Sequence, residues 1–194
     1  MTEVREEIRV GEKIKRIRED RAVSLEEMSK KTGLSTSVLS QIENHLISPP
    51  LGTLIKVARA LEIPVGQFFG EEPTEPFCLV RKDERQKVSR FASKDGVNYG
   101  YSYESLGYGK KDRHMEPFVV TLSPATLGAS DLSSHAGEEF IYVLEGEVEV
   151  ALAGHTDQLN PHDSIYYDAT IPHRVACTRG KEAKIVAVIW TPAG

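Results

Sequence analysis

The chain has little of what marks several common protein classes. Its two cysteines, Cys78 and Cys177, lie far apart in the sequence, so we expect two buried free thiols rather than a disulfide framework. No run of about 18 apolar residues occurs, which argues against a transmembrane helix. The first ten residues are charged and contain no apolar core. We therefore expect no secretory signal, no membrane partner and a cytoplasmic location.

An excess of positive charge is also missing from the whole chain. The formal net charge is −5, but residues 8–70 hold ten Lys and Arg against seven Asp and Glu. This locally basic balance suits phosphate contacts by one region, and it does not indicate a general affinity for nucleic acid. With 194 residues, 40% of them hydrophobic, the chain can form one large or two small cores.

The residues from Ser24 to Asn44 predict two short helices joined by a tight turn. Ser24 and Glu27 have the spacing of a capping box, Gly33 can end the first helix in a left-handed conformation, and Ser35 can cap the second. The apolar side chains of the second helix share one face, which leaves small polar side chains outside. A helix-turn-helix places such side chains against base edges in the DNA major groove. The predicted DNA-contacting set is Ser24, Ser35, Thr36, Ser37, Ser40, Gln41 and Asn44.

This segment and its flanks, roughly residues 8–70, resemble the helix-turn-helix of the xenobiotic-response-element (XRE) regulators. The resemblance implies an all-α, phage-repressor-like domain of five helices. It implies that Thr36, Ser37 and Gln41 face base edges, and that Ser24, Ser40 and Asn44 contact bases or phosphates. It also implies a structural ion pair between Arg18 and Glu43. The family usually has glycine after the position of Asn44, where this chain has His45, so His45 must end the helix.

An acidic, Pro-rich stretch at 70–76 separates the helical region from segments with alternating polarity. We predict a helix-turn-helix domain at 1–70, a linker at 71–78 and a β-domain at 79–194. The chain is thus an α+β protein of two domains, and many short strands indicate a sandwich or barrel of the jelly-roll kind. The predicted strands lie at 77–82, 97–103, 117–122, 139–152, 164–169, 173–177 and 184–190.

One group of residues in the β-domain suggests a metal site. Alternate residues on a strand share a face, so His135, Gly137 and Glu139 lie on one side, and His173 from a later strand can complete the set. Two imidazoles and one carboxylate are the ligands of a facial-triad non-haem iron site. The same ligands also suit zinc, nickel or manganese.

The stretches 133–150 and 159–177 resemble the paired motifs of the cupin superfamily, a double-stranded β-helix. Glu139 with Gly146 matches the first motif, and Pro172–His173 matches the second. Ser133 stands where many cupins have a further histidine, so the resemblance implies three ligands. Many regulatory cupins have lost the metal and keep a pocket for an organic ligand, and both alternatives stay open. The residues expected to shape the pocket are Ser133, Tyr101, Tyr103, Phe140, Tyr142 and Tyr166.

An XRE helix-turn-helix joined to one cupin resembles a bacterial class of small ligand-responsive transcription regulators. The resemblance implies a non-enzymatic homodimer that pairs through its cupin domains. It implies that the dimer binds a palindromic operator in double-stranded DNA and responds to a small-molecule effector.

Two other functions stay open. The same domain order and triad occur in the iron-dependent hydroxypropylphosphonate epoxidases, which are oxidoreductases. Against this chemistry, Ala22 aligns with their active-site lysine and Ser102 with their reactive tyrosine. The other alternative is a metal-sensing repressor, in which the metal at the triad is itself the effector.

Overall fold

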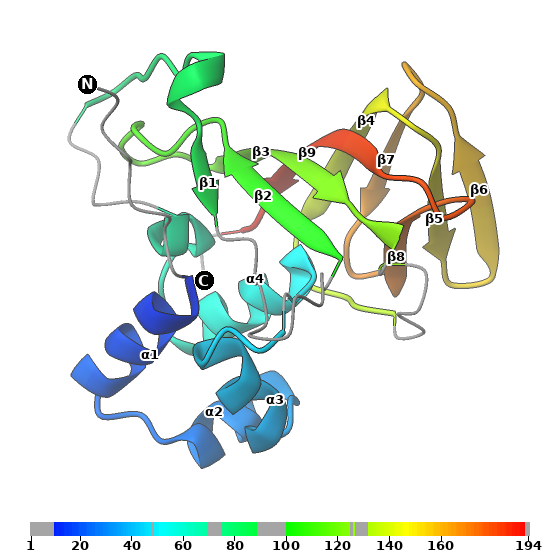
Figure 1. Cartoon of the computed structure of the whole chain (residues 1–194). Helices are drawn as coiled ribbons and strands as arrows, with labels where there is room; N and C mark the ends of the chain where they lie inside the picture. The colour runs from blue at the N-terminus through cyan, green and yellow to red at the C-terminus, as the bar shows by residue number, and fades with distance from the viewer. Residues whose placement is uncertain are drawn as a thin grey trace.

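The helical region lies at the N-terminal end of the chain (Figure 1). The computed structural model describes residues 10–47, 49–69, 75–88, 100–124, 126 and 132–192. Within these residues the five predicted helices are present, and the fifth is a 3₁₀ helix. The elements are α1 (Val10–Asp20), α2 (Leu25–Thr32), α3 (Thr36–Glu43), α4 (Leu51–Ala60) and η1 (Val65–Phe69).

The ends of α2 and α3 follow the local signals in the sequence. The Ser24 hydroxyl accepts a hydrogen bond from the Glu27 amide, and the Glu27 carboxylate accepts one from the Ser24 amide, so the predicted capping box is confirmed. Gly33 ends α2 with φ of 73°. The Ser35 hydroxyl caps α3. His45 adopts φ of 57°, so a non-glycine residue does take the left-handed position after α3.

The predicted ion pair between Arg18 and Glu43 is also confirmed. Arg18 Nε lies 2.6 Å from Glu43 Oε1, and Arg18 Nη2 lies 2.9 Å from Oε2, a two-point contact that joins α1 to α3. Hydrogen bonds to Glu43 raise the pKa of Arg18 above its ordinary value. The pair is almost completely buried, so its role is to stabilise the domain from within.

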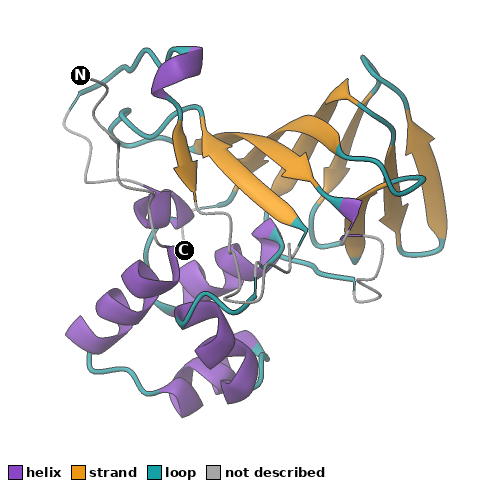
Figure 2. Cartoon of the chain, in the orientation of Figure 1, coloured by secondary structure: helices purple, strands orange, loops and turns teal. Residues whose placement is uncertain are grey.

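The C-terminal region consists of two antiparallel sheets (Figure 2). One has six described strands in the order β1-β2-β3-β9-β4-β7, and the other has three in the order β6-β5-β8. The apolar core lies between them, as in the predicted jelly roll. The strands are β1 (Gln86–Val88), β2 (Tyr101–Ser105), β3 (Met115–Leu122), β4 (Glu138–Glu145), β5 (Val148–Leu152), β6 (His155–Leu159), β7 (Ser164–Asp168), β8 (His173–Cys177) and β9 (Ala183–Trp190).

Four details of the strand prediction need correction, of which the first is that β1 was not predicted. No strand forms at 77–82: Phe77 and Leu79 are exposed, and a short 3₁₀ helix, η2 (Lys82–Glu84), precedes β1. The segment 139–152 is two strands, because Gly146 turns the chain with φ of 77°. β6 was missed because it is a polar edge strand in which Leu159 alone is buried. Of the predicted strand at 97–103, residues 97–99 lie outside the described part.

The helical region packs directly on the large sheet. Phe69 of η1 meets Phe118 of β3 edge to face, with ring centroids 4.8 Å apart. Beside this contact, Gly66 lies against a buried ion pair in which Arg113 Nε is 2.7 Å from Glu116 Oε2. A side chain at position 66 would overlap the Arg113 guanidinium, so this close approach requires glycine. Burial raises the pKa of Glu116, although Arg113 and the Gly66 amide counteract the rise.

Among the described residues no helix has both the length and the apolar character needed to cross a membrane.

Candidate metal centre and nucleic-acid interface

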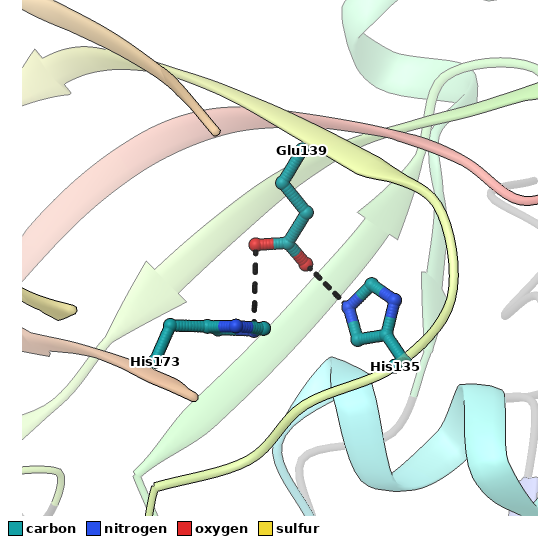
Figure 3. Close-up of side chains that lie close together, drawn as sticks. All are labelled: His135, Glu139 and His173. Atoms are coloured by element: carbon teal, nitrogen blue, oxygen red, sulfur yellow. Dashed lines mark hydrogen bonds and ion pairs between the residues drawn. The ribbon is translucent and has the colours of Figure 1, made fainter. Parts of the chain in front are cut away.

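The predicted metal ligands meet at one buried point (Figure 3). His135 precedes β4, Glu139 lies on β4 and His173 begins β8, so three separate backbone positions converge. His135 Nε2 lies 3.1 Å from Glu139 Oε1, and His173 Nε2 lies 3.8 Å from Glu139 Oε2. One donor atom from each residue lies within 4.8 Å of the others. The geometry therefore allows one metal ion to be held by all three residues.

The surroundings of the two rings fit a cation. His135 Nδ1 faces the Ala136 carbonyl at 3.2 Å, and His173 Nδ1 faces the Ile171 carbonyl at 2.8 Å. His135 thus has an acceptor at both nitrogens, whereas a neutral imidazole carries one proton, and His173 Nε2 faces the same carboxylate at 3.8 Å. A cation bound between the two Nε2 atoms and the carboxylate would interact with the unprotonated Nε2 of each ring. Each Nδ1 would then keep its proton and donate it to the backbone carbonyl. This is the arrangement that orients histidine ligands in metal sites.

Glu139 is held in its ionised form. Burial alone would raise its pKa, but the hydrogen bond with His135, the nearby His173 and the Tyr167 hydroxyl together lower the pKa below its ordinary value. Tyr167 donates its hydroxyl proton to Glu139, and burial together with this carboxylate raises the pKa of Tyr167. The site is therefore a buried carboxylate beside two imidazoles, which attracts positive charge.

A cavity of about 60 Å³ adjoins the triad. This is room for roughly two water molecules at about 30 Å³ each. Burial raises the pKa of Tyr101 to about 12 and that of Tyr103 well above its ordinary value, so both lining hydroxyls stay protonated. The lining residues are Pro50, Leu51, Gly52, Tyr101, Tyr103, Val120, Leu122, Ser133, Glu139, Ile141, His173, Arg174, Val175, Ile185 and Ala187.

Half of the residues expected in the pocket lie elsewhere. Tyr101, Tyr103 and Ser133 line the cavity, but Phe140, Tyr142 and Tyr166 do not. Glu139 and Ile141 point inward from β4, so the alternation of a strand turns Phe140 and Tyr142 outward. Tyr166 pairs with Phe140 across β4 and β7, and it is 63% exposed on the same outer face.

The cavity wall also contains residues of the helical region that sequence reasoning missed. Pro50, Leu51 and Gly52 come from the start of α4, in the helical region. Their sequence carries no pattern that points to a ligand site, since they reach it only because the two domains pack together. Ala22 and Ser102, the positions that matter for epoxidase chemistry, are not among the lining residues.

The predicted DNA-contacting residues of α3 are exposed or half-buried. Thr36, Ser37 and Asn44 are exposed, and Ser40 and Gln41 are half-buried. Asn44 donates a side-chain hydrogen bond to the Ser40 carbonyl at 2.8 Å, which orients its amide at the end of α3. The hydroxyls of Ser24 and Ser35 cap α2 and α3 and lie at the helix starts, where backbone N–H groups favour phosphate.

Comparison with known families identifies both regions. The family described as Helix-turn-helix matches residues 14–68, and the family described as Cupin domain matches residues 118–189. The HTH-type transcriptional regulator PuuR of Escherichia coli (strain K12) is 26% identical over 179 residues, which cover 91% of this chain and 92% of that protein. The chain therefore contains a helix-turn-helix domain followed by a cupin domain. It is a DNA-binding regulator whose cupin is its ligand-binding domain.

Two further relatives share the domain order. The (S)-2-hydroxypropylphosphonic acid epoxidase of Streptomyces wedmorensis is 33% identical over 150 residues, 71% of this chain and 73% of the enzyme. A crystal structure of a helix-turn-helix family transcriptional regulator from Vibrio cholerae superposes with a TM-score of 0.62 and 24% identity, over 95% of this chain and 96% of that one. The fold of both domains therefore occurs in a regulator, and a related sequence occurs in an enzyme.

Proposed function

We propose that this regulator binds a palindromic operator as a homodimer and that a divalent cation at His135, Glu139 and His173 forms part of its effector site. The observation that supports the metal is the buried triad, in which a backbone carbonyl faces the outer nitrogen of each ring. The ligand types suit iron, zinc, nickel or manganese. A bound cation would supply positive charge and open coordination positions beside the cavity.

We assign recognition of the DNA sequence to Thr36, Ser37 and Gln41 on α3. Their side chains hydrogen-bond in both directions, as base edges in the major groove require. Ser24, Ser35, Ser40 and Asn44 would fix the position of the domain through phosphates or further bases. In the view of Figure 1, α2 and α3 lie at the lower edge of the molecule, away from the sheets.

The homodimer is supported by the outer face of the large sheet. Phe140 pairs with Val188, and Trp190 pairs with Met115, so strands β3, β9 and β4 present a row of apolar side chains. Met115 is 60% exposed and Trp190 is 40% exposed. Soluble monomers seldom expose such contiguous apolar surface. A two-fold axis through this face would present two α3 helices to an inverted repeat.

An epoxidase-like activity is the second candidate, because the Streptomyces wedmorensis enzyme is 33% identical. Against it, Ala22 aligns with the active-site lysine of such enzymes and Ser102 with their reactive tyrosine, although the phenols of the flanking Tyr101 and Tyr103 do line the cavity. A metal-free pocket for an organic effector and a metal-sensing repressor are the remaining alternatives.

The proposal is tested on the full-length chain. Metal content is measured by elemental analysis, mass by light scattering, and DNA affinity on duplexes that the protein selects from a random pool, with and without chelator. We expect bound metal, a dimer and enrichment of an inverted repeat. A monomer without sequence preference would contradict the proposal. Iron-dependent oxygen consumption with (S)-2-hydroxypropylphosphonic acid would instead favour the enzyme.

A further inference from the structure

The DNA-binding domain touches a ligand of the metal centre. A Cβ atom at Gly52 would lie 3.0 Å from Ser133 Oγ and 3.1 Å from His135 Cδ2. At these distances a methyl group fits only if Ser133 or the His135 ring moves by a few tenths of an ångström, so the first turn of α4 lies close to that ring. The same turn follows the DNA-reading helix α3 after the short connection between Glu43 and Leu51.

Tyr103 makes a second link between the two domains. Its buried hydroxyl donates a hydrogen bond of 3.0 Å to the Pro49 carbonyl, just before α4. Its ring lines the cavity and packs on Phe118, with centroids 6.2 Å apart. Phe118 in turn packs on Phe69 of η1. One side chain therefore contacts the cavity, the entry to α4 and the aromatic junction of the domains.

The size of the cavity limits what can bind without moving α4. Its 60 Å³ accommodates only a few non-hydrogen atoms beside the triad. Small-molecule pockets usually enclose about 300–1,000 Å³. The wall away from the triad is mainly apolar, with Leu51, Val120 and Leu122 among its members. Four of the lining residues lie outside the strands: Pro50, Leu51 and Gly52 at the start of α4, and Ser133 before β4.

We infer that the effector site is shared between the domains, and that Leu51 and Gly52 of the DNA-binding domain set the size of the ligand it accepts. The site would take a divalent cation together with a compact, mostly apolar molecule whose polar end meets the triad. A ligand that presses on Leu51 or Gly52 displaces the start of α4 and weakens the hydrogen bond from Tyr103 to Pro49. This inference rests on the proposed function and adds a contact through which the metal site and the DNA-binding helix influence each other.

Because the two domains share this wall, metal binding should change the affinity for DNA, and DNA binding should change the affinity for the metal. A ligand that favours one position of α4 changes the DNA affinity, and operator DNA must change the affinity for that ligand by the same factor. Fixing the His135 ring on a cation is the smallest such change, because that ring is in contact with Gly52. Zinc alone is therefore a sufficient probe.

The first experiment measures zinc affinity of the full-length protein by competition with a chelating dye. Gly52→Ala should weaken zinc binding by about tenfold, the size seen when groups that orient a metal ligand are disturbed. Thr53→Ala is the matched control, since it also raises helix propensity in α4 but does not line the cavity. Equal zinc affinities of the two variants would overturn the inference.

The second experiment measures the ratio of operator affinities with and without zinc, on a selected duplex. We expect a ratio of at least about fivefold in the wild type. Tyr103→Phe should bring the ratio close to one, measured at a zinc concentration that saturates the variant. Tyr108→Phe is the control, because its hydroxyl also donates to a backbone carbonyl, that of Glu84. A Tyr103→Phe variant that keeps the wild-type ratio would contradict the inference.

A third measurement needs no variant. Zinc added to the wild type should change hydrogen-exchange protection of the backbone amides at 51–55 as well as near the triad. Unchanged exchange at 51–55 would show that α4 does not sense the site. If the wild type bound neither an operator nor zinc, the proposed function itself would be wrong. That outcome differs from unchanged exchange at 51–55, which would contradict only the further inference.

Discussion

Glu43→Ala is expected to destabilise the helical region strongly. The Glu43 side chain is 5% exposed and receives two hydrogen bonds from Arg18, which is 11% exposed. Removing one partner of such a pair leaves a buried charge and typically costs about 3–5 kcal/mol. Glu19 lies 3.6 Å from the guanidinium and is half exposed, so it offsets part of the loss. We therefore expect about 3 kcal/mol, the lower end of that range.

The assay is urea unfolding followed by far-ultraviolet circular dichroism. Asp20→Ala is the matched control, because Asp20 pairs with Arg16 on the same helix at 3.9 Å with both side chains mostly exposed. That pair should contribute about 0.5 kcal/mol or less. The double variant Arg18→Met/Glu43→Leu should recover most of the stability, since apolar pairs often replace buried ion pairs at little cost. If Glu43→Ala and Asp20→Ala behave alike, the pair does not brace α1 against α3.

Three further predictions concern the proposed sites. Gln41→Ala should cost about 1–3 kcal/mol on the selected operator but little on unrelated DNA, measured by fluorescence anisotropy; an equal loss on both would refute base reading. Val188→Glu, on the outer face of β9, should give a monomer by light scattering and leave zinc affinity unchanged; a persistent dimer would place the interface elsewhere. His173→Ala should reduce the metal content to less than about a tenth of the wild-type value by elemental analysis, since two ligands do not close a site. His155→Ala, an exposed histidine on β6, should retain the wild-type metal content, and equal loss in both variants would argue against the triad.

The predictions that succeeded depend on interactions between residues close in sequence. The capping box of Ser24 and Glu27 and the turn at Gly33 are set by backbone geometry within one helical turn, so spacing alone reveals them. Strand alternation does not explain the meeting of His135 and Glu139, because β4 begins at Glu138 and the chain bends at Gly137 with φ of 107°. The three residues are identified instead by the paired motifs of the cupin resemblance.

The errors have equally specific causes. Alternating polarity at 77–82 predicted a strand, but a strand also needs a neighbour, and Phe77 and Leu79 remain exposed. β6 has no apolar alternation, because an edge strand buries little. Phe140 and Tyr142 could have been assigned to the outer face from the sequence, since an inward Glu139 already requires it. Aromatic character alone does not show which face of a strand a side chain occupies.

The shared wall of the cavity could not have been predicted in this way. The contact between the domains depends on two glycines with no common pattern, Gly52 against His135 and Gly66 against Arg113 and Glu116. A larger residue at either position would push on the side chains that it meets. A domain joined only by a linker would not need either contact. One contact involves a residue of the triad, and the other involves a buried ion pair that includes Glu116 of β3. A shift of the His135 ring by a few tenths of an ångström would therefore press on the start of α4, the helix that follows α3.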